Sequence, residues 1–272
     1  MLKELYLIPV AVYIFSYLPL LFQKKKMYKV FISLIYAGFA LQTLIFFIFL
    51  GIKGFTVPVH IDRFVFFNAW ILMFIVVLFG LFYKVEYILL YITPLVALNL
   101  LIGFFVPHVH IKLVMLNADK TILLTHIVLI LIGDSLFALA FIVSLIYIFQ
   151  ERKIKNKKNL KILDINSGRG YNLELLDNIN YQCLKIGFPF ITLGIVMGIY
   201  LSGSLFRTFI VVKPIEIMSL ITWLIYAVLL HERVAKGLRG KRAAIFSVAG
   251  FLLILFSLIF SFYLFPAFHG FE

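Results

Sequence analysis

Residues 121–149 of the chain read TILLTHIVLILIGDSLFALAFIVSLIYIF. Asp134 is the only charged residue in this stretch, which is longer than the roughly 20 apolar residues that a helix needs to cross the hydrocarbon core of a membrane. The apolar residues form one continuous run, whereas a strand of a membrane β-barrel alternates apolar and polar positions. The stretch therefore predicts a membrane-spanning α-helix.

The rest of the chain has a similar composition. Of its 272 residues, 64% are hydrophobic and 14% are charged, with a mean hydropathy of +1.09. A soluble domain is about 45–50% apolar and about 25% charged, and a soluble fold of this size has too little polar surface to cover so much apolar mass. The composition excludes a soluble enzyme and a disordered chain. It indicates an integral membrane protein that is embedded over almost its whole length.

The fold class that follows is all-α, a polytopic membrane bundle of about eight transmembrane helices. We expect it to form a single membrane domain over residues 1–272. Helices are expected because hydrocarbon offers no partner for an unpaired backbone N–H. The predicted spans are 5–22, 29–51, 64–82, 87–106, 121–149, 186–206, 217–231 and 243–265.

The basic residues predict the orientation of the bundle. Of the 25 Lys and Arg residues, 18 fall in one set of connecting loops and 7 fall on the opposite side. Because Lys and Arg concentrate on the cytoplasmic side, both termini are expected outside, and the protein is expected to be a multi-pass protein of the cytoplasmic (inner) membrane. The net charge of +13 is thereby explained by topology in the lipid bilayer, so nucleic acid is not an expected partner.

The longest predicted loop, residues 150–185, lies on the cytoplasmic side. It begins with a basic run from Glu151 to Lys158, which is expected to follow anionic lipid headgroups. Apolar residues then recur at helical spacing, namely Leu173, Leu176, Ile179 and Cys183. This pattern predicts a short amphipathic helix at the membrane interface that leads into the sixth span.

The topology sorts the six histidines. His126 lies just inside the outer end of the fifth span, His269 just beyond the outer end of the last span, and His231 at the cytoplasmic end of the seventh. Imidazole is a common axial ligand of haem iron, but a lone histidine is more often solvated or bonded to helix carbonyls. The remaining three, His60, His108 and His110, lie in outer loops, and the His108-x-His110 pair has no third metal ligand in its own loop.

Asp134 is the only acidic residue near the middle of a span. An intramembrane carboxylate is a candidate functional group, and Asp134 lies about two helical turns from His126. Two interpretations stay open: it lines a polar cavity, or it forms a hydrogen bond that ties helices together beside Gly133 and Ser135. The chain has no P-loop, HExxH, GxSxG or dinucleotide fingerprint, and its single cysteine, Cys183, excludes disulfide frameworks.

Several segments of the second half resemble one family of membrane proteins. Residues 187–195, GFPFITLGI, resemble the GFPLLTLGI stretch of the cytochrome c assembly protein family, the CcsA/CcmC/HemX group. Together the similar segments cover most of residues 121–272, in the family's order. They are His126 to Arg152, LLDNINY at 175–181, SLITWLIYAVLL at 219–230 followed by His231, and Phe268-His269-Gly270.

The resemblance implies a cofactor, b-type haem that is bound transiently. It implies that His126 and His269 are axial haem ligands at the outer face, and that His231 serves a second haem position in the membrane. The chain departs from the family at residues 202–216, where only Pro214 and Glu216 remain of the tryptophan-rich WGxxWxWDPKE loop. This departure leaves four residues as expected haem contacts: Phe206 and Phe209 through their rings, and Arg207 and Lys213 through the propionates.

Three functions are compatible with these features. The leading hypothesis is a haem-handling protein of cytochrome c biogenesis that positions haem at the outer face for attachment to apocytochrome c. It would act with a companion membrane subunit that has a large outer domain, as part of an attachment system and not as a stand-alone enzyme. The first alternative is a HemX-like membrane regulator of haem biosynthesis, and the second is a small-solute transporter that uses Asp134.

Overall fold

The computed structural model describes residues 2–22, 25–53, 61–83, 85–105, 119–155, 172–206 and 214–264. Within these ranges eight helical segments are long and apolar enough to cross a membrane, and no strand occurs. The predicted all-α fold with eight spans is confirmed. The side of the membrane on which the termini lie, and the single domain over 1–272, stay predictions.

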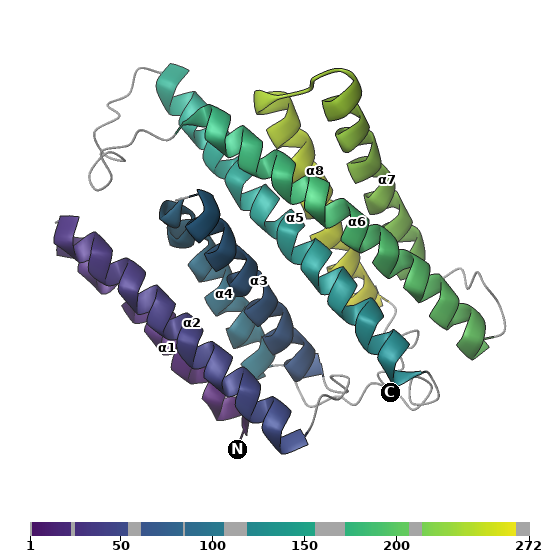
Figure 1. The fold of residues 1–272 in the computed structure, drawn as a ribbon, viewed down its shortest axis with the longest axis horizontal. Helices are drawn as coiled ribbons and strands as arrows, with labels where there is room; N and C mark the ends of the chain where they lie inside the picture. Colours follow the sequence, from purple (N-terminus) through teal and green to yellow (C-terminus); the bar gives the residue numbers. More distant parts are fainter. Residues whose placement is uncertain are drawn as a thin grey trace. The chain divides into compact units, whose positions relative to one another are not determined.

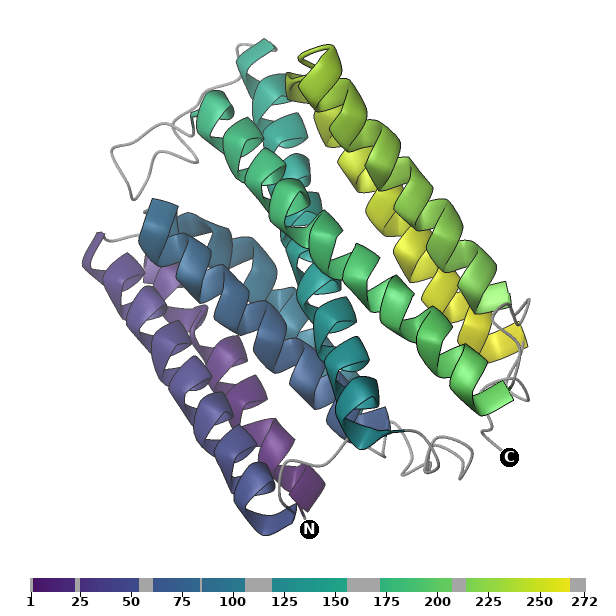
Figure 2. The ribbon, with the colours of Figure 1, turned by 45° about the vertical axis from the view of Figure 1, so that its right-hand side comes forward.

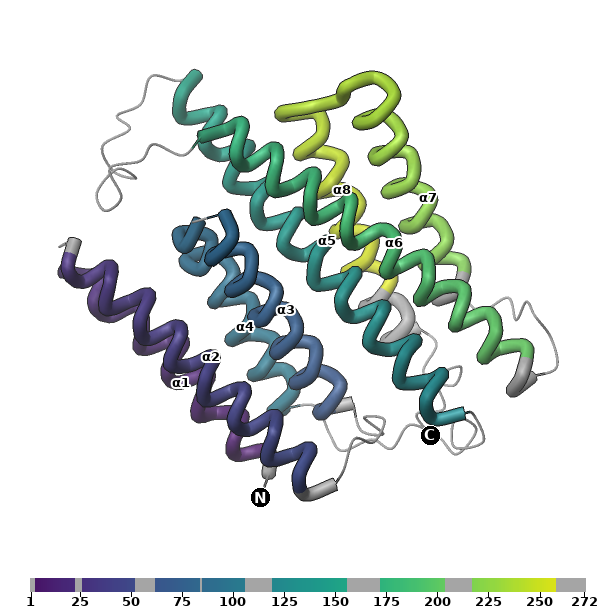
Figure 3. Tube along the Cα trace, viewed as in Figure 1, coloured from purple at the N-terminus to yellow at the C-terminus, as the bar shows by residue number. Residues whose placement is uncertain are grey.

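Each predicted span corresponds to a helical segment in the structure (Figure 1 and, as a tube, Figure 3). The first span is a short helix, α1 (Leu7–Phe15), between two 3-10 turns at Leu2–Tyr6 and Leu18–Phe22. A third 3-10 turn, Glu86–Ile88, precedes α4. The other helices are α2 (Lys25–Lys53), α3 (Ile61–Tyr83), α4 (Leu89–Phe105), α5 (Lys120–Lys155), α6 (Leu173–Phe206), α7 (Pro214–Ala235) and α8 (Gly240–Leu264).

The structure differs from the sequence-based expectation between α5 and α6. The segment predicted to be a separate interfacial helix is the beginning of α6 itself, where Leu176, Ile179 and Cys183 are fully buried. The apolar face of this segment is therefore covered by protein. The predicted 150–185 loop is correspondingly shorter, because α5 continues to Lys155 and residues 156–171 lie outside the described part.

Local interactions account for the two ends of α5. The Asp119 carboxylate accepts hydrogen bonds from the backbone N–H groups of Thr121 at 2.8 Å and Ile122 at 3.3 Å, which are otherwise orphan donors of the first turn. The last turn carries three basic residues, Arg152, Lys153 and Lys155, which are favourable at the negative end of the helix dipole.

The residues group into two compact units, which are described separately. The first unit comprises residues 1–108 with 149–173. In it, α1 contacts α2 and α4, and α3 contacts α2 and α4. Tyr13 of α1 fits against Gly38 of α2, where an added Cβ would lie 2.7 Å from the ring, and its hydroxyl donates to Gln42 at 2.7 Å.

The second unit comprises residues 109–148 with 174–272 and is organised by a seam between antiparallel α5 and α6. Large residues of one helix lie against glycines of the other in four consecutive contacts. These pairs are His126 with Gly198, Ile130 with Gly194, Gly133 with Ile191, and Phe137 with Gly187. Each step of four or three residues along α5 is matched by an equal step along α6, as in an antiparallel coiled coil. We refer to this line of contacts as the α5–α6 seam.

The helices α7 and α8 complete the second unit as an antiparallel pair joined by a short turn, and they stay adjacent in both views (Figures 1 and 2). One aromatic layer connects them to the seam. The Phe137 ring stacks on Tyr226 of α7 with centroids 3.9 Å apart, and Tyr226 in turn fits against Gly250 of α8. Phe137, which also lies against Gly187, thus contacts two neighbouring helices at one level.

The two units repeat one local arrangement. Residues 38–44 read GFALQTL and residues 187–193 read GFPFITL. In each unit the threonine of this segment accepts a hydrogen bond from a tryptophan of the following helix: Trp70 to Thr43 at 3.0 Å, and Trp223 to Thr192 at 2.9 Å. The two tryptophans of the chain therefore have equivalent hydrogen-bonding roles, and the match indicates that the halves are built on one helix-pair pattern.

The close approach in the seam predicts that Gly187→Ala destabilises the protein. A Cβ at position 187 would lie 2.9 Å from the Phe137 ring and 3.1 Å from the Leu136 Cβ, and such overpacking costs about 1–3 kcal/mol. Gly80→Ala in α3 is the matched control, because nothing lies within 4 Å of its Cβ position and alanine is the better helix former. Thermal unfolding in detergent, followed by circular dichroism, should show a lower midpoint for the first variant only; equal midpoints would contradict the seam.

Candidate functional site

His126 is the predicted ligand that the structure describes most fully. It lies on α5 in the seam, half-buried, and its Nδ1 is 2.7 Å from the backbone carbonyl oxygen of Gly194 on α6. Because a carbonyl oxygen only accepts hydrogen bonds, Nδ1 must carry the hydrogen. In the neutral ring Nε2 is then left with a free lone pair. This is the arrangement of metal-ligating histidines, which donate their other ring N–H to a carbonyl or carboxylate.

The space for this ring depends on Gly198. A Cβ at position 198 would lie 2.9 Å from Cε1 and 3.4 Å from Nδ1 of His126. The imidazole therefore lies directly against the α6 backbone, and even a methyl group at position 198 would displace it. Gly194 and Gly198 together set both the position of the ring and its tautomer.

Asp134, the second predicted site residue, is not brought into contact with His126. It lies two turns further along α5. Among the described residues its carboxylate makes no hydrogen bond or ion pair, and the neighbouring Ser135 hydroxyl is buried without a hydrogen-bond partner there. The structure thus gives no support for a hydrogen bond from Asp134 that ties helices together. The transporter hypothesis based on Asp134 stays a prediction.

His231 lies on α7 with its side chain exposed. The buried face of α7 carries Tyr226, Leu229 and Arg233 at helical spacing, so His231, two positions before Arg233, points away from the core of the second unit. A ligand of His231 would therefore bind on the exposed surface of the second unit and not within its core.

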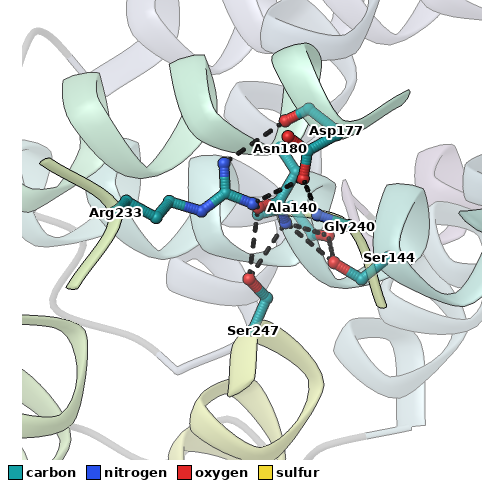
Figure 4. A network of polar contacts seen from close by, with 7 residues as sticks. All are labelled: Ala140, Ser144, Asp177, Asn180, Arg233, Gly240 and Ser247. Carbon is teal, nitrogen blue, oxygen red and sulfur yellow. Dashed lines mark hydrogen bonds and ion pairs between the residues drawn. The ribbon is translucent and has the colours of Figure 1, made fainter. Parts of the chain in front are cut away.

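Arg233 is the centre of a polar network that sequence reasoning did not find (Figure 4). Its side chain is 3% exposed, and the guanidinium donates to the Asp177 carboxylate at 3.0 Å and to the side-chain amide oxygen of Asn180 at 2.8 Å, both on α6. The guanidinium also lies over the Tyr181 ring, 5.5 Å from its centroid. Asn180 continues the network to α5 and α8: its amide donates to Ser144 at 2.7 Å and to Ser247 at 3.0 Å.

The network also determines where α8 begins. The Asp177 carboxylate accepts a second hydrogen bond, at 3.0 Å, from the backbone N–H of Gly240, the first residue of α8. Gly240 has a φ of +70°, a conformation that favours glycine. All four helices of the second unit therefore meet in one buried cluster. Loss of one partner of a buried ion pair typically costs about 3–5 kcal/mol, because the other charge is left unpaired.

Several predicted residues lie outside the described part of the chain. These are His269, Arg207, Phe209 and Lys213, together with the loop histidines His60, His108 and His110. Phe206 is the last residue of α6, but its side chain is not described. Within the described ranges no group of three or more His, Cys, Asp or Glu side chains is placed to hold a metal ion. Whether His126 and His269 meet stays a prediction.

Comparison with known proteins gives the family. The chain is 42% identical over 90 residues to the cytochrome c biogenesis protein CcsA of Porphyra purpurea, a match that covers 33% of this chain and 28% of that protein. It is 30% identical over 159 residues to CcsA of Heterosigma akashiwo, covering 48% and 49%, and 38% identical over 81 residues to CcsA of a Nostoc species, covering 30% and 23%.

These matches span at most about half the length of the named relatives. No solved structure is significantly similar to the chain. The sequence profile of the cytochrome c assembly protein family matches residues 5–269, nearly the whole chain. The chain therefore belongs to the cytochrome c assembly protein family.

Proposed function

We propose that this protein binds haem through His126 and positions it at the outer face of the membrane for attachment to apocytochrome c. The observation that carries the proposal is the 2.7 Å hydrogen bond from His126 Nδ1 to the Gly194 carbonyl, since it leaves Nε2 free to donate its lone pair to iron. When bound, haem supplies an iron centre that takes an imidazole nitrogen as an axial ligand. Family membership and relatives named as cytochrome c biogenesis proteins support this role.

The chain's own contribution in this proposal is binding and orientation. His126 is held against α6 by a backbone carbonyl and by the absence of a side chain at Gly198, so the ring is pre-organised before a ligand arrives. His269 is proposed as the second axial ligand. Arg207 and Lys213 are proposed to pair with the propionates, and Phe206 and Phe209 to contact the macrocycle. His231, exposed on α7, is the proposed ligand of a second haem position.

The proposed partners follow from the chemistry of covalent attachment. The thioether bonds of a c-type cytochrome form between haem vinyl groups and the thiols of the apocytochrome. The single cysteine of this chain, Cys183, is fully buried, and so it offers no thiol for this step. We propose that a companion membrane subunit with a large outer domain guides the apocytochrome to the bound haem, and that the complex resides in the cytoplasmic membrane.

A HemX-like regulator of haem biosynthesis is the second candidate. The observation that favours it is the loss of every tryptophan from residues 202–216, the segment that corresponds to the family's tryptophan-rich loop. Haem bound at His126 would, in that case, be sensed and not delivered.

Replacement of His126 should abolish haem binding at the outer-face site. We expect the purified His126→Ala protein to lose most of its Soret absorbance on haem titration, because the pre-organised axial nitrogen is gone. His126→Gly should regain a six-coordinate spectrum when free imidazole is added, since imidazole can occupy the space of the deleted ring. An unchanged Soret band in His126→Ala would contradict the ligand assignment.

Gly198→Ala should weaken haem binding without removing the ligand. The added Cβ would lie 2.9 Å from Cε1 of His126, so the ring must rotate and its bond to the Gly194 carbonyl must lengthen. Changes to groups that orient a metal ligand typically cost about 10–100-fold in affinity, and we expect a loss in that range by haem titration. Gly51→Ala, where nothing lies within 4 Å, is the matched control and should bind haem as the unaltered protein does.

Deletion of the gene separates delivery from regulation. If the protein delivers haem, covalent c-type haem in the membranes should fall to near background, because no apocytochrome receives its cofactor. This loss is measured by haem staining of denaturing gels, with a plasmid copy as the control. Normal c-type haem with altered porphyrin levels would instead support the HemX-like regulator.

A further inference from the structure

We propose that Asn180 is a positioning residue that sets the register of the α5–α6 seam and thereby holds His126 over Gly198. Asn180 contacts α5 at Ser144, and His126 lies on the same helix about 27 Å away at 1.5 Å per residue. The inference rests on the proposed function of His126, but the register itself is measurable without haem.

The seam has the same length on both helices between the two sites. Along α5 the seam positions from Ser144 to His126 are spaced by four, three, four, three and four residues. Along α6 the positions from Asn180 to Gly198 follow the same spacing in the opposite direction. A contact fixed at the Asn180 end is therefore transmitted to the His126 end without a bulge or an offset.

Apolar packing alone discriminates weakly against a slip of one heptad. In the slipped register Ile130 would lie against Gly187 and Gly133 against Leu184, so a large residue would still face a glycine at both levels. The slipped register is unfavourable at the two ends of the seam. His126 would face Ile191 in place of Gly198, and Asn180 would face Phe137 in place of Ser144.

Asn180 is a buried polar side chain that has its hydrogen-bond partners on α5 only in the observed register. It is 2% exposed, and its amide donates to Ser144 at 2.7 Å and to the Ala140 carbonyl at 3.1 Å on α5. Its side-chain oxygen Oδ1 accepts a hydrogen bond from Arg233 at 2.8 Å (Figure 4). Opposite Phe137 the amide would lose both bonds to α5 and keep its bond to Ser247 of α8 at 3.0 Å. Loss of hydrogen bonds by a buried amide is costly. A single buried asparagine sets register in coiled coils for the same reason.

Asn180→Leu removes this selection and leaves Arg233 and Ser144 each with a partner, while the Ser247 hydroxyl loses its hydrogen bonds to Asn180. Arg233 keeps its ion pair with Asp177 at 3.0 Å, and Ser144 keeps its hydrogen bond to the Ala140 carbonyl at 2.7 Å. Leucine is apolar and similar in size to asparagine, so it can occupy this buried position. The helical content of the variant should therefore be close to that of the unaltered protein.

The register is read by the distance between two spin labels on the full-length protein in detergent. Thr121 on α5 and Asn178 on α6 are both exposed and lie near opposite ends of the seam, so a slip of one heptad changes their separation by about 10 Å. Electron–electron double resonance should give one distance in the unaltered protein. In Asn180→Leu we expect a second population, shifted by about 10 Å, together with a loss of haem affinity of about tenfold or more.

Two further variants keep the test decisive. Thr192→Val removes another hydrogen bond of α6, the part-buried one from Trp223 at 2.9 Å, and should change neither the distance nor the haem affinity. Asn180→Ser introduces a hydroxyl that can form a hydrogen bond to Ser144. This variant should show a single spin-label distance, and it serves as the test if Asn180→Leu inserts poorly into the membrane.

A single, unshifted distance in Asn180→Leu would overturn the proposal, whatever the haem affinity. Two distances with unchanged haem affinity would overturn the link to His126 while leaving the register role. If His126→Ala binds haem normally, the proposed function fails instead, and the spin-label distances still report the register independently.

Discussion

The close contact between α5 and α6 is the interaction on which the second unit depends. Lipid tails are as apolar as leucine, so helices in a membrane associate through close packing and hydrogen bonds and not through the hydrophobic effect. Glycines on one helix let the side chains of the other reach its backbone, with glycine Cβ positions only 2.4–2.9 Å from the nearest side-chain atoms. That approach is what allows a histidine ring to bond a main-chain carbonyl of the neighbouring helix.

The polar groups of the second unit divide between the two ends of this seam. At one end His126 is held with one nitrogen bonded and the other free. At the other end Arg233, Asp177 and Asn180 join α5, α6, α7 and α8 in a single cluster. The cluster connects the start of α8 to the seam, and it orients α7 so that His231 faces outward.

Much of the architecture could be predicted from the sequence because the membrane imposes simple rules. Apolar run length predicted all eight spans, and the segment GFPFITLGI identified the family before its geometry was known. The role of its glycines could not be predicted from helix propensity. Gly187 and Gly194 are needed because large side chains of α5 lie directly against them. A signal was present in the four-three spacing from His126 to Ser144, which is typical of a helix seam. Arg233 could not be singled out because it is one of five basic residues in 231–242, and such a run beside a membrane span is usually solvated.

The family profile covers both halves of the chain, and the first half repeats the local design of the second half. Gly38 accommodates Tyr13 as Gly187 accommodates Phe137, and each tryptophan bonds a threonine of the preceding helix. The repeats are 149 positions apart, too far for a short-period comparison to detect. The two units differ in chemistry, since His126, His231 and the Arg233 network all belong to the second.

The claim at the centre of this account is that α6 fixes the tautomer of His126 and leaves Nε2 as the free nitrogen. Nitrogen-15 NMR of the haem-free protein with labelled histidine, assigned by comparison with His126→Ala, measures this directly. We expect a protonated Nδ1 and an unprotonated Nε2 for His126. A ring protonated at Nε2, or one that exchanges freely between the two tautomers, would contradict it.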